Sequence, residues 1–363
     1  MRKRVVTAMS GGVDSSVAAA LLKEQGYEVI GLTMNLFSLP REFCQEESLR
    51  SCCGWRAFED AQRVAMALEI PHYAADFKDS FEKKVIADFC EEYRKGRTPN
   101  PCIRCNQYIK FGALIKRAKK LSADYIATGH HARVEYDARR GQYLLKKGKD
   151  KEKDQSYFLY PLTQEHLSLT LMPIGEKTKT EVRKIAENLG LPVAQKPESQ
   201  EICFVPGNNY AQFLKGRIPE GSKPGPIVDL NLHLLGQHRG IIHYTVGQRK
   251  GMGVAASHPL YVLSIDVGKN EIVVGPNEKL YKSKLLASQV HFISGEKLAQ
   301  PLIVKAKIRH RHLEAKAGVT PLDKGQVLVE FEKPQRAITP GQSVVFYQDD
   351  LVVGGAVIDR VLG

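Results

Sequence analysis

The sequence predicts an α/β protein: a doubly wound, mainly parallel sheet first, then short β-strands in the last part of the chain. Two observations carry this prediction. Over the first 130 residues, apolar runs alternate with helical patterns, which is typical of a parallel sheet covered by helices. From about residue 207 the pattern changes to short β-like runs separated by glycine and proline turns, which is typical of small β domains.

The first part is expected to contain four strands and four helices. Gly26 ends the first helical pattern, the second stops before Pro71, and the third repeats apolar residues at every fourth position. The expected strands are 4–9, 28–35, 72–77 and 123–130, and the expected helices are 15–26, 57–70, 79–96 and 109–121. Gly11, Gly12 and Gly129 then fall at the carboxyl ends of strands, where such sheets bind ligands.

Length and composition favour a soluble protein of several domains. A chain of 363 residues exceeds the usual size of one hydrophobic core, so two or three domains are expected. The longest apolar runs are too short to cross a bilayer, and the start MRKRVVTAMSGG reaches glycines before a signal-peptide core forms. We therefore expect a cytoplasmic location without a membrane partner, in which the seven cysteines are thiols, metal ligands or catalytic groups.

Charge points to a polyanionic partner. Lysine and arginine outnumber aspartate and glutamate by 53 to 40, and the excess gathers at 94–97, 116–120, 146–153 and 309–312. Nucleic acid is the commonest polyanion that such a surface binds. The alternative is a basic surface that is merely solvated.

A candidate phosphate-binding loop, SGGVDSS, runs from Ser10 to Ser16 between the first strand and the first helix. Its small residues let backbone N–H groups approach a ligand, and the helix N-terminus adds positive partial charge. The loop lacks both the Gly-Lys-Ser/Thr ending of a kinase-type loop and the dinucleotide fingerprint. Pyrophosphate suits it, with Asp14 as a candidate Mg²⁺ ligand. The alternative is an ordinary tight turn in which Asp14 caps the helix.

The cysteines allow several chemistries. NPCIRCN, residues 100–106, is expected to be a loop, and its Cys102 and Cys105 could clip a metal, form a redox disulfide or supply a nucleophile. Taken alone, Cys203 fits a buried strand. The remaining four thiols have simpler assignments: Cys90 in a helix core, and Cys44, Cys52 and Cys53 in a mobile active-site lid or, less in keeping with their spacing, a metal site.

SGGVDSS resembles the Ser-Gly-Gly-x-Asp-Ser signature of the PP-loop ATP pyrophosphatases, which adenylate a carbonyl oxygen and release pyrophosphate. That signature alone leaves amide synthetases, thiouridylases and lysidine synthetases open. Further segments resemble conserved blocks of one branch, the tRNA-specific 2-thiouridylases, in the same order and over nearly the whole chain. These segments are NPCIRCNQYIKF, ATGHHAR, KDQSYFLY, PESQEICFV, YTVGQRKGMG and ITPGQSVVFY.

The resemblance implies an adenine nucleotide α-hydrolase-like domain over 1–206, a central β domain over 207–278 and a C-terminal β-barrel over 279–363. It also implies a reaction. ATP would adenylate the C2 oxygen of the wobble uridine, position 34, of a tRNA, and persulfide sulfur would displace AMP. Cys203 would carry the persulfide and Cys105 would be the second thiol, closing a disulfide. A cysteine desulfurase or a sulfur-relay protein would supply the sulfur.

The resemblance also assigns residues to the two substrates. The ATP site would comprise Ala8, Met9, Ser10, Gly11, Gly12, Val13, Asp14, Ser15, Met34 and Gly129. Residues Asn100, Pro101 and Cys102 would border the flipped base. The other expected tRNA contacts are His130, Lys153, Asp154, Gln155, Arg309, His310 and Gln342. Taken singly, these side chains also fit a solvated charge run or a strand-end histidine.

Cys102 departs from the family pattern, which has aspartate at this position. With Cys105 and Cys203 it makes three cysteines, which leaves two mechanisms open. One is an iron–sulfur cluster held by the three thiols. The other is a persulfide mechanism in which Cys102 is a local substitute or a redox partner. Two further classes of function remain. A PP-loop amide or amidine synthetase does not explain Cys203, and a non-catalytic RNA-binding protein does not explain the intact SGGVDSS loop.

Overall fold

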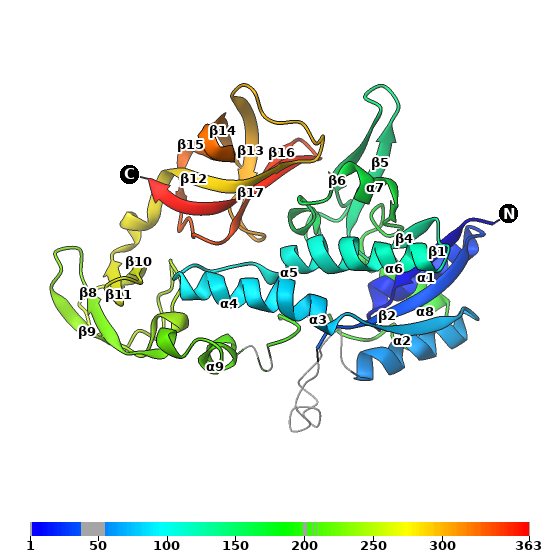
Figure 1. The fold of residues 1–363 in the computed structure, drawn as a ribbon, viewed down its shortest axis with the longest axis horizontal. Coiled ribbons are helices and arrows are strands. Elements are labelled where there is room, and N and C mark those ends of the chain that lie inside the picture. The colour runs from blue at the N-terminus through cyan, green and yellow to red at the C-terminus, as the bar shows by residue number, and fades with distance from the viewer. Residues whose placement is uncertain (1, 38–54, 199–201, 206, 208, 363) are drawn as a thin grey trace.

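The computed structural model describes residues 2–37, 55–198, 202–205, 207 and 209–362. It shows an elongated molecule in which a parallel-sheet domain and a small β domain lie at opposite ends, with a β-barrel between them (Figure 1). The parallel sheet has the order β3-β2-β1-β4-β7, and all four of its strand pairs are parallel. Its strands are β1 (Arg4–Ala8), β2 (Glu28–Asn35), β3 (His72–Asp76), β4 (Tyr125–Ala127) and β7 (Thr170–Leu171). The predicted doubly wound sheet is confirmed.

Both faces of this sheet are covered by helices. Val5 and Val6 are both fully buried but belong to different apolar clusters, because successive residues of a strand point to opposite faces. The cluster around Val5 includes residues of α1 (Val13–Glu24), α2 (Trp55–Ala67) and α8 (Lys179–Asn188). The cluster around Val6 includes the two long helical rods that follow. The alanine-rich face of α1 lets this helix lie close to the sheet.

Each rod is a continuous helical stretch with a π-helical segment. The first comprises α3 (Lys78–Phe81), η2 (Glu82–Ile86) and α4 (Ala87–Arg94). The second comprises α5 (Pro101–Arg104), η3 (Cys105–Ala113) and α6 (Leu114–Lys120), so the prediction of a loop at 100–106 is wrong. Asn100 accepts a hydrogen bond from the backbone N–H of Cys102 at 3.2 Å, and Pro101 occupies the first helical position. An N-cap followed by proline starts a helix.

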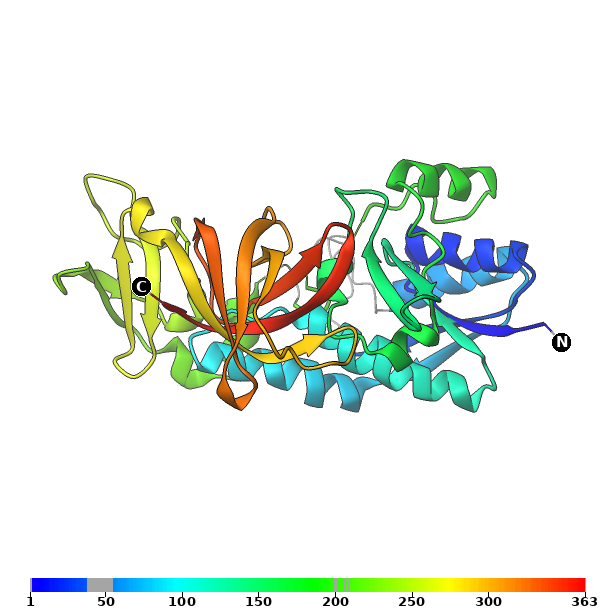
Figure 2. The same cartoon turned by 90° about the horizontal axis from the view of Figure 1, so that it is seen from above.

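The segment after β4 holds a hairpin that was not expected. The predicted strand 123–130 extends only over Tyr125–Ala127, and β5 (Ala132–Asp137) and β6 (Gln142–Lys147) follow as an antiparallel pair. Through the pairing of Lys146 with Leu351, this hairpin joins the sheet of the C-terminal barrel. Figure 2 shows β17 (Leu351–Leu362) of the barrel, in red, reaching toward the hairpin. Two short helices complete this part, η4 (Ser156–Phe158) and α7 (Gln164–Ser168).

The last part of the chain is β-rich, as predicted. A four-stranded sheet of order β10-β11-β8-β9 holds β8 (Gly225–Val228), β9 (Leu234–His238), β10 (Tyr261–Asp266) and β11 (Glu271–Gly275). Six further strands close into a barrel, because β12 pairs with both β15 and β17. They are β12 (Tyr281–Phe292), β13 (Leu302–Lys307), β14 (Ala315–Pro321), β15 (Val327–Arg336), β16 (Ser343–Gln348) and β17 (Leu351–Leu362). The short helices here are α9 (Tyr210–Lys215), η6 (Pro219–Ser222), η7 (Ile241–His243), η8 (Asn277–Leu280) and η9 (Asp323–Gly325).

No helix among the described residues is long and apolar enough to span a membrane.

Candidate active site

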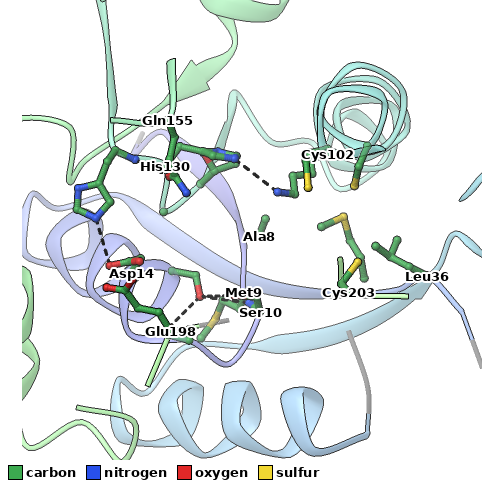
Figure 3. Close-up of a pocket in the computed structure, with 18 of the residues that line it drawn as sticks. Ala8, Met9, Ser10, Asp14, Leu36, Cys102, His130, Gln155, Glu198 and Cys203 are labelled. Atoms are coloured by element: carbon green, nitrogen blue, oxygen red, sulfur yellow. Dashed lines mark hydrogen bonds and ion pairs between the residues drawn. The ribbon is translucent and has the colours of Figure 1, made fainter. Parts of the chain in front are cut away.

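A cavity of about 360 Å³ opens at the carboxyl ends of β1, β2 and β4. Its walls come from the SGGVDSS loop, the start of the second helical rod, the segment after β4 and the segment that carries Cys203 (Figure 3). It has one strongly polar side and one side rich in sulfur and apolar groups. The expected site residues that line it are Ala8, Met9, Ser10, Gly12, Val13, Asp14, Ser15, Met34, Pro101, Cys102, Cys105, Gly129, His130, Lys153, Gln155 and Cys203.

The SGGVDSS loop lines this cavity at the N-terminus of α1. Gly12 is the N-cap of α1 and provides no side-chain acceptor for the first-turn N–H groups. The hydroxyl of Ser15 donates to the carbonyl oxygen of Gly12 at 3.1 Å and accepts from the backbone N–H of Ser10 at 3.2 Å, which fixes the loop. A fixed loop at a helix N-terminus is suited to a phosphate group.

Two glycines allow this loop to pack closely. Gly11 has φ +65°, a conformation that residues with a Cβ rarely adopt, and it does not itself line the cavity. At Gly129, a Cβ atom would lie 2.5 Å from the backbone nitrogen of Ser15. The segment after β4 therefore contacts the backbone of the loop directly, and only glycine fits there.

A chain of ion pairs crosses the polar side of the cavity. The ammonium of Lys179 lies 2.6 Å from Oδ1 of Asp14 and 3.4 Å from Oε1 of Glu198. The other oxygen of Glu198 lies 2.9 Å from Nζ of Lys153, and His131 Nε2 lies 3.4 Å from Asp14. The chain thus connects the phosphate loop to the residues that precede Cys203.

The charges keep both carboxylates ionised. Burial raises the pKa of Asp14, but the His131 hydrogen bond and the Lys179 ammonium outweigh it, so the pKa lies below its ordinary value. The same balance, with burial opposed by Lys153 and Lys179, lowers the pKa of Glu198. When a nucleotide is bound, Lys153 and Lys179 can pair with its phosphates in place of these carboxylates. This side of the cavity is therefore suited to an anion.

Lys179 is held in place by local sequence. Thr178 and Glu181 form a capping box at the start of α8, in which the Thr178 side chain accepts from the Glu181 backbone N–H and the Glu181 carboxylate accepts from the Thr178 backbone N–H. Lys179 is the first residue of this helix and is 8% exposed. A second lysine, Lys196, donates to the carbonyl oxygen of Gly11 at 2.9 Å and pairs with Asp60. Both ammonium groups are therefore fixed beside the loop.

The sulfur side holds three cysteines. Cys102 is exposed and Cys105 is buried, both at the start of the second rod, whereas Cys203 is half-buried on the opposite segment. Figure 3 shows Cys102 and Cys203 on opposite walls of the same space. Cys203 also packs against the apolar cluster that contains Cys105.

The three thiols do not form a metal-binding cluster in this arrangement. Within residues 2–37, 55–198, 202–205, 207 and 209–362, no group of three or more His, Cys, Asp or Glu side chains is placed to hold a metal ion. The described residues therefore do not show an iron–sulfur site on Cys102, Cys105 and Cys203, and the cluster stays a hypothesis. Cys90 is buried in the core of α4, as predicted, and Cys44, Cys52 and Cys53 lie outside the described residues.

Comparison with protein-family models assigns the chain in three consecutive pieces. Residues 3–207 match the model described as the tRNA methyl transferase HUP domain. Residues 211–276 match a tRNA methyl transferase PRC-barrel domain, and residues 282–358 match an aminomethyltransferase beta-barrel domain. The chain is 54% identical over 360 residues to tRNA-specific 2-thiouridylase MnmA 2 of Caldanaerobacter subterraneus, covering 98% of both chains. The chain belongs to the tRNA-specific 2-thiouridylase family.

A second relative of the family also matches over nearly the whole length of both chains. The chain is 51% identical over 361 residues to tRNA-specific 2-thiouridylase MnmA of Clostridium perfringens, with 99% of each chain matched. The likeness therefore spans all three parts of the thiouridylase-family chain and not the nucleotide domain alone. The resemblance stated from the sequence blocks is confirmed.

Five of the expected tRNA contacts do not line the cavity: Asn100, Asp154, Arg309, His310 and Gln342. Asp154 is buried, and its carboxylate accepts from the backbone N–H groups of Gly148 and Ser156 and from the Ser156 hydroxyl. Its observed contacts hold the loop that carries Lys153 and Gln155. Gln155 in turn accepts from the backbone N–H of His131 at 2.9 Å.

The barrel residues contact the first domain from the other side. The ring of His310 lies 4.4 Å from that of Phe158, between ring centroids, and burial lowers the pKa of His310. Arg309 donates to the carbonyl oxygens of Arg336 and Ala337, inside the barrel. These contacts place His310 at the junction of the barrel and η4 and Arg309 within the barrel domain, and neither residue lines the cavity.

Sequence reasoning missed five ionisable residues of the cavity: Lys110, His131, Lys179, Lys196 and Glu198. Lys110, His131 and Glu198 lie inside sequence blocks that resemble the family, but residue type alone did not single them out. A local signal existed for Lys179, because the capping box Thr178–Glu181 places it in the first turn of a helix. We find no local signal for Lys196.

Proposed function

We propose that this protein is an ATP-dependent tRNA-uridine 2-sulfurtransferase that thiolates the wobble uridine, position 34. One observation supports the proposal most directly. A single cavity brings together the phosphate loop, Lys153, Lys179 and Lys196 on its polar side, and the three thiols on its other side. Adenylation and sulfur transfer at one carbon atom need these groups within reach of the same base. The names of the family relatives, which match over nearly their whole length, agree with this reaction.

In the first step, the C2 oxygen of the uridine attacks the α-phosphorus of ATP and pyrophosphate leaves. The phosphate loop from Gly12 to Ser15 would bind the departing pyrophosphate through backbone N–H groups, assisted by Lys179 and Lys196. Gly129 fixes the loop, and Ala8 and Met34 line the same cavity on the strand ends. The result is a good leaving group, AMP, at C2.

Asp14 would hold the Mg²⁺ that accompanies ATP. The lowered pKa of Asp14 keeps its carboxylate ionised, and Mg²⁺ is commonly bound by one or two carboxylates together with substrate phosphates. The ion would screen the negative charge of the triphosphate. To bind it, the Asp14 carboxylate would exchange its contact with Lys179 for the ion.

In the second step, sulfur replaces oxygen. The terminal sulfur of a Cys203 persulfide attacks C2, and AMP leaves with the original oxygen. The Cys105 thiolate then attacks Sγ of Cys203, the S–S bond of the adduct breaks, and the outer sulfur stays on the uridine as 2-thiouridine. Cys105 and Cys203 are oxidised to a disulfide while the transferred sulfur is reduced. The route is supported by the placement of Cys105 and Cys203, which line the same cavity and belong to the same apolar neighbourhood.

The tRNA and the sulfur donor are the proposed partners. Asn100, Pro101 and Cys102 would border the flipped base, with His130, Lys153 and Gln155 on the facing wall. Arg309, His310 and Gln342 would contact the anticodon arm from the barrel side. Asp154 would contribute to tRNA binding indirectly, by fixing the loop that carries Lys153 and Gln155. A cysteine desulfurase or sulfur-relay protein would load Cys203. The cytoplasm is the proposed location, because tRNA and such donors are found there.

The test is a reconstituted reaction with ATP, a cysteine desulfurase with cysteine, and either a tRNA with U34 or the same tRNA with C34. We expect AMP and 2-thiouridine to form only with U34. Cys203→Ala should abolish thiolation and leave tRNA affinity within a few-fold of wild type. AMP formation without RNA would favour a small-molecule amide synthetase, and tRNA binding without AMP would favour a non-catalytic RNA-binding protein.

A further inference from the structure

The reaction proposed above leaves a disulfide in a poorly accessible place. Cys105 is 8% exposed and Cys203 is half-buried, and both line the cavity that holds the substrates. A bond between their sulfurs has to be reduced once per turnover before Cys203 can be loaded again. A bulky reductant cannot easily reach a buried sulfur, so reduction needs a route to the surface.

Cys102 stands at the surface end of such a route. It is exposed, it lines the same cavity, and it precedes Cys105 by three residues in one continuous helical stretch. Side chains three apart on a helix are neighbours, with Cβ atoms ~5–6 Å apart. A disulfide needs Cβ atoms ~3.5–4.5 Å apart, so a small local adjustment allows Cys102 and Cys105 to bond.

We propose that Cys102 is the resolving thiol of this enzyme. The inference rests on the proposed persulfide mechanism. The Cys102 thiolate attacks Sγ of Cys105 in the Cys105–Cys203 disulfide. A Cys102–Cys105 bond forms, the Cys105–Cys203 bond breaks, and Cys203 leaves as a thiolate that is ready for a new persulfide. The exchange is redox-neutral. A dithiol reductant then attacks the exposed sulfur of Cys102, takes up the oxidation as its own disulfide, and restores both thiols.

The position of Cys105 explains why the exchange would run through it. Cys105 has Cys102 one helical turn before it, and Cys203 packs against its apolar cluster from the opposite segment. Among the described cysteines, Cys90 is buried in α4 and does not line the cavity.

The test follows the disulfide through one turnover. Enzyme carrying persulfide is mixed with ATP and excess U34 tRNA without reductant, quenched with acid, alkylated, and mapped by peptide mass spectrometry. In wild type we expect mainly the Cys102–Cys105 disulfide, with Cys203 alkylated. In Cys102→Ser we expect the Cys105–Cys203 disulfide instead. Cys90→Ala serves as the matched control, because its thiol lies outside the cavity, and it should give the wild-type pattern.

A kinetic readout accompanies the mapping. With limiting dithiothreitol, Cys102→Ser should need at least tenfold more reductant than wild type to reach half of its own maximal turnover rate. A Cys105–Cys203 disulfide in both proteins, with equal reductant dependence, would overturn the inference and leave the proposed function intact. A disulfide from Cys203 to any other cysteine would also overturn it. Absence of 2-thiouridine in every sample, by contrast, would overturn the proposed function itself.

Discussion

The side-chain amide of Gln342 donates a hydrogen bond to the carbonyl oxygen of Thr98 over 2.7 Å, across 244 positions of sequence. The backbone N–H of Thr98 in turn donates to the carbonyl oxygen of Pro340 at 2.9 Å. Between these bonds, a Cβ atom on Gly341 would lie 2.9 Å from the Thr98 nitrogen, so the two loops are in close contact. Because Thr98 lies just before the N-cap Asn100, the barrel positions the start of the helix that carries Cys102 and Cys105.

Replacing Gln342 with alanine should loosen this helix start. A hydrogen bond of this kind is worth about 0.5–1.5 kcal/mol, so amide hydrogen exchange in residues 98–106 should become faster by up to about tenfold. Hydrogen exchange followed by mass spectrometry measures it. Gln348→Ala, at the exposed end of β16, is the control and should change nothing. Unchanged exchange together with weaker tRNA binding would instead make Gln342 a direct RNA contact.

The parallel sheet could be predicted because its signals are local. Each of its first three strands is an apolar run bounded by turn residues, and the helices between them repeat apolar residues at helical spacing. The hairpin at 132–147 could not be placed in the same way. The strand that pairs with it is β17, through Leu351 and Lys146. No sequence pattern within the hairpin predicts a pairing strand some 200 positions away.

The helix at 101–104 is a different case, because its signal is present in the sequence. Asn100 followed by Pro101 is a helix start, but the Cys-x-x-Cys spacing after it also fits a loop that binds a metal, forms a redox disulfide or supplies a nucleophile. The residues of the site also divide into those that a local sequence pattern predicts and those that only the fold brings together. The phosphate loop and the thiols stand in recognisable motifs, whereas Lys196 enters the cavity only through the tertiary fold.

Lys179→Met should weaken nucleotide binding. The substitution leaves the Asp14 and Glu198 carboxylates beside the phosphate loop with one compensating ammonium fewer, and they would repel a triphosphate. We expect at least a tenfold higher Kd for a non-hydrolysable ATP analogue, which corresponds to about 1.4 kcal/mol. Isothermal titration calorimetry measures it. Lys177→Met, two residues earlier and outside the cavity lining, is the control, and equal affinities of the two variants would contradict the assignment.

His130 should make stability depend on pH. Burial, with the nearby Lys110 ammonium, places the pKa of His130 well below its usual value, so the ring stays neutral in the folded protein. The unfolded chain takes up this proton below about pH 6.5, and therefore stability is present above that pH and is lost as the pH falls.

For this single group, lowering the pH from 7.5 to 5.5 should cost about 1.4 kcal/mol of folding free energy, measured as a lower thermal midpoint. Over the same pH range, the free energy of unfolding of His130→Gln should fall by less than that of wild type, and the difference should equal the cost given for His130. Other buried histidines contribute equally to both proteins, so the difference isolates His130. The control is Gln348→Ala, at an exposed position without a titratable group, which should keep the wild-type pH dependence. An identical shift in all three proteins would show that His130 is protonated in the fold.

Gly129→Ala should disturb the phosphate loop without touching a charge. The added Cβ would lie 2.5 Å from the backbone nitrogen of Ser15 and 2.6 Å from the carbonyl carbon of Asp14, and backbone atoms cannot rotate away as a side chain can. We expect the loop to shift and the Kd for an ATP analogue to rise at least tenfold, because its N–H groups no longer converge on the phosphates. Gly216→Ala is the matched control, since a Cβ there meets nothing within 4 Å and its φ of −76° suits alanine. Normal ATP affinity in Gly129→Ala would mean that the segment after β4 does not position the loop.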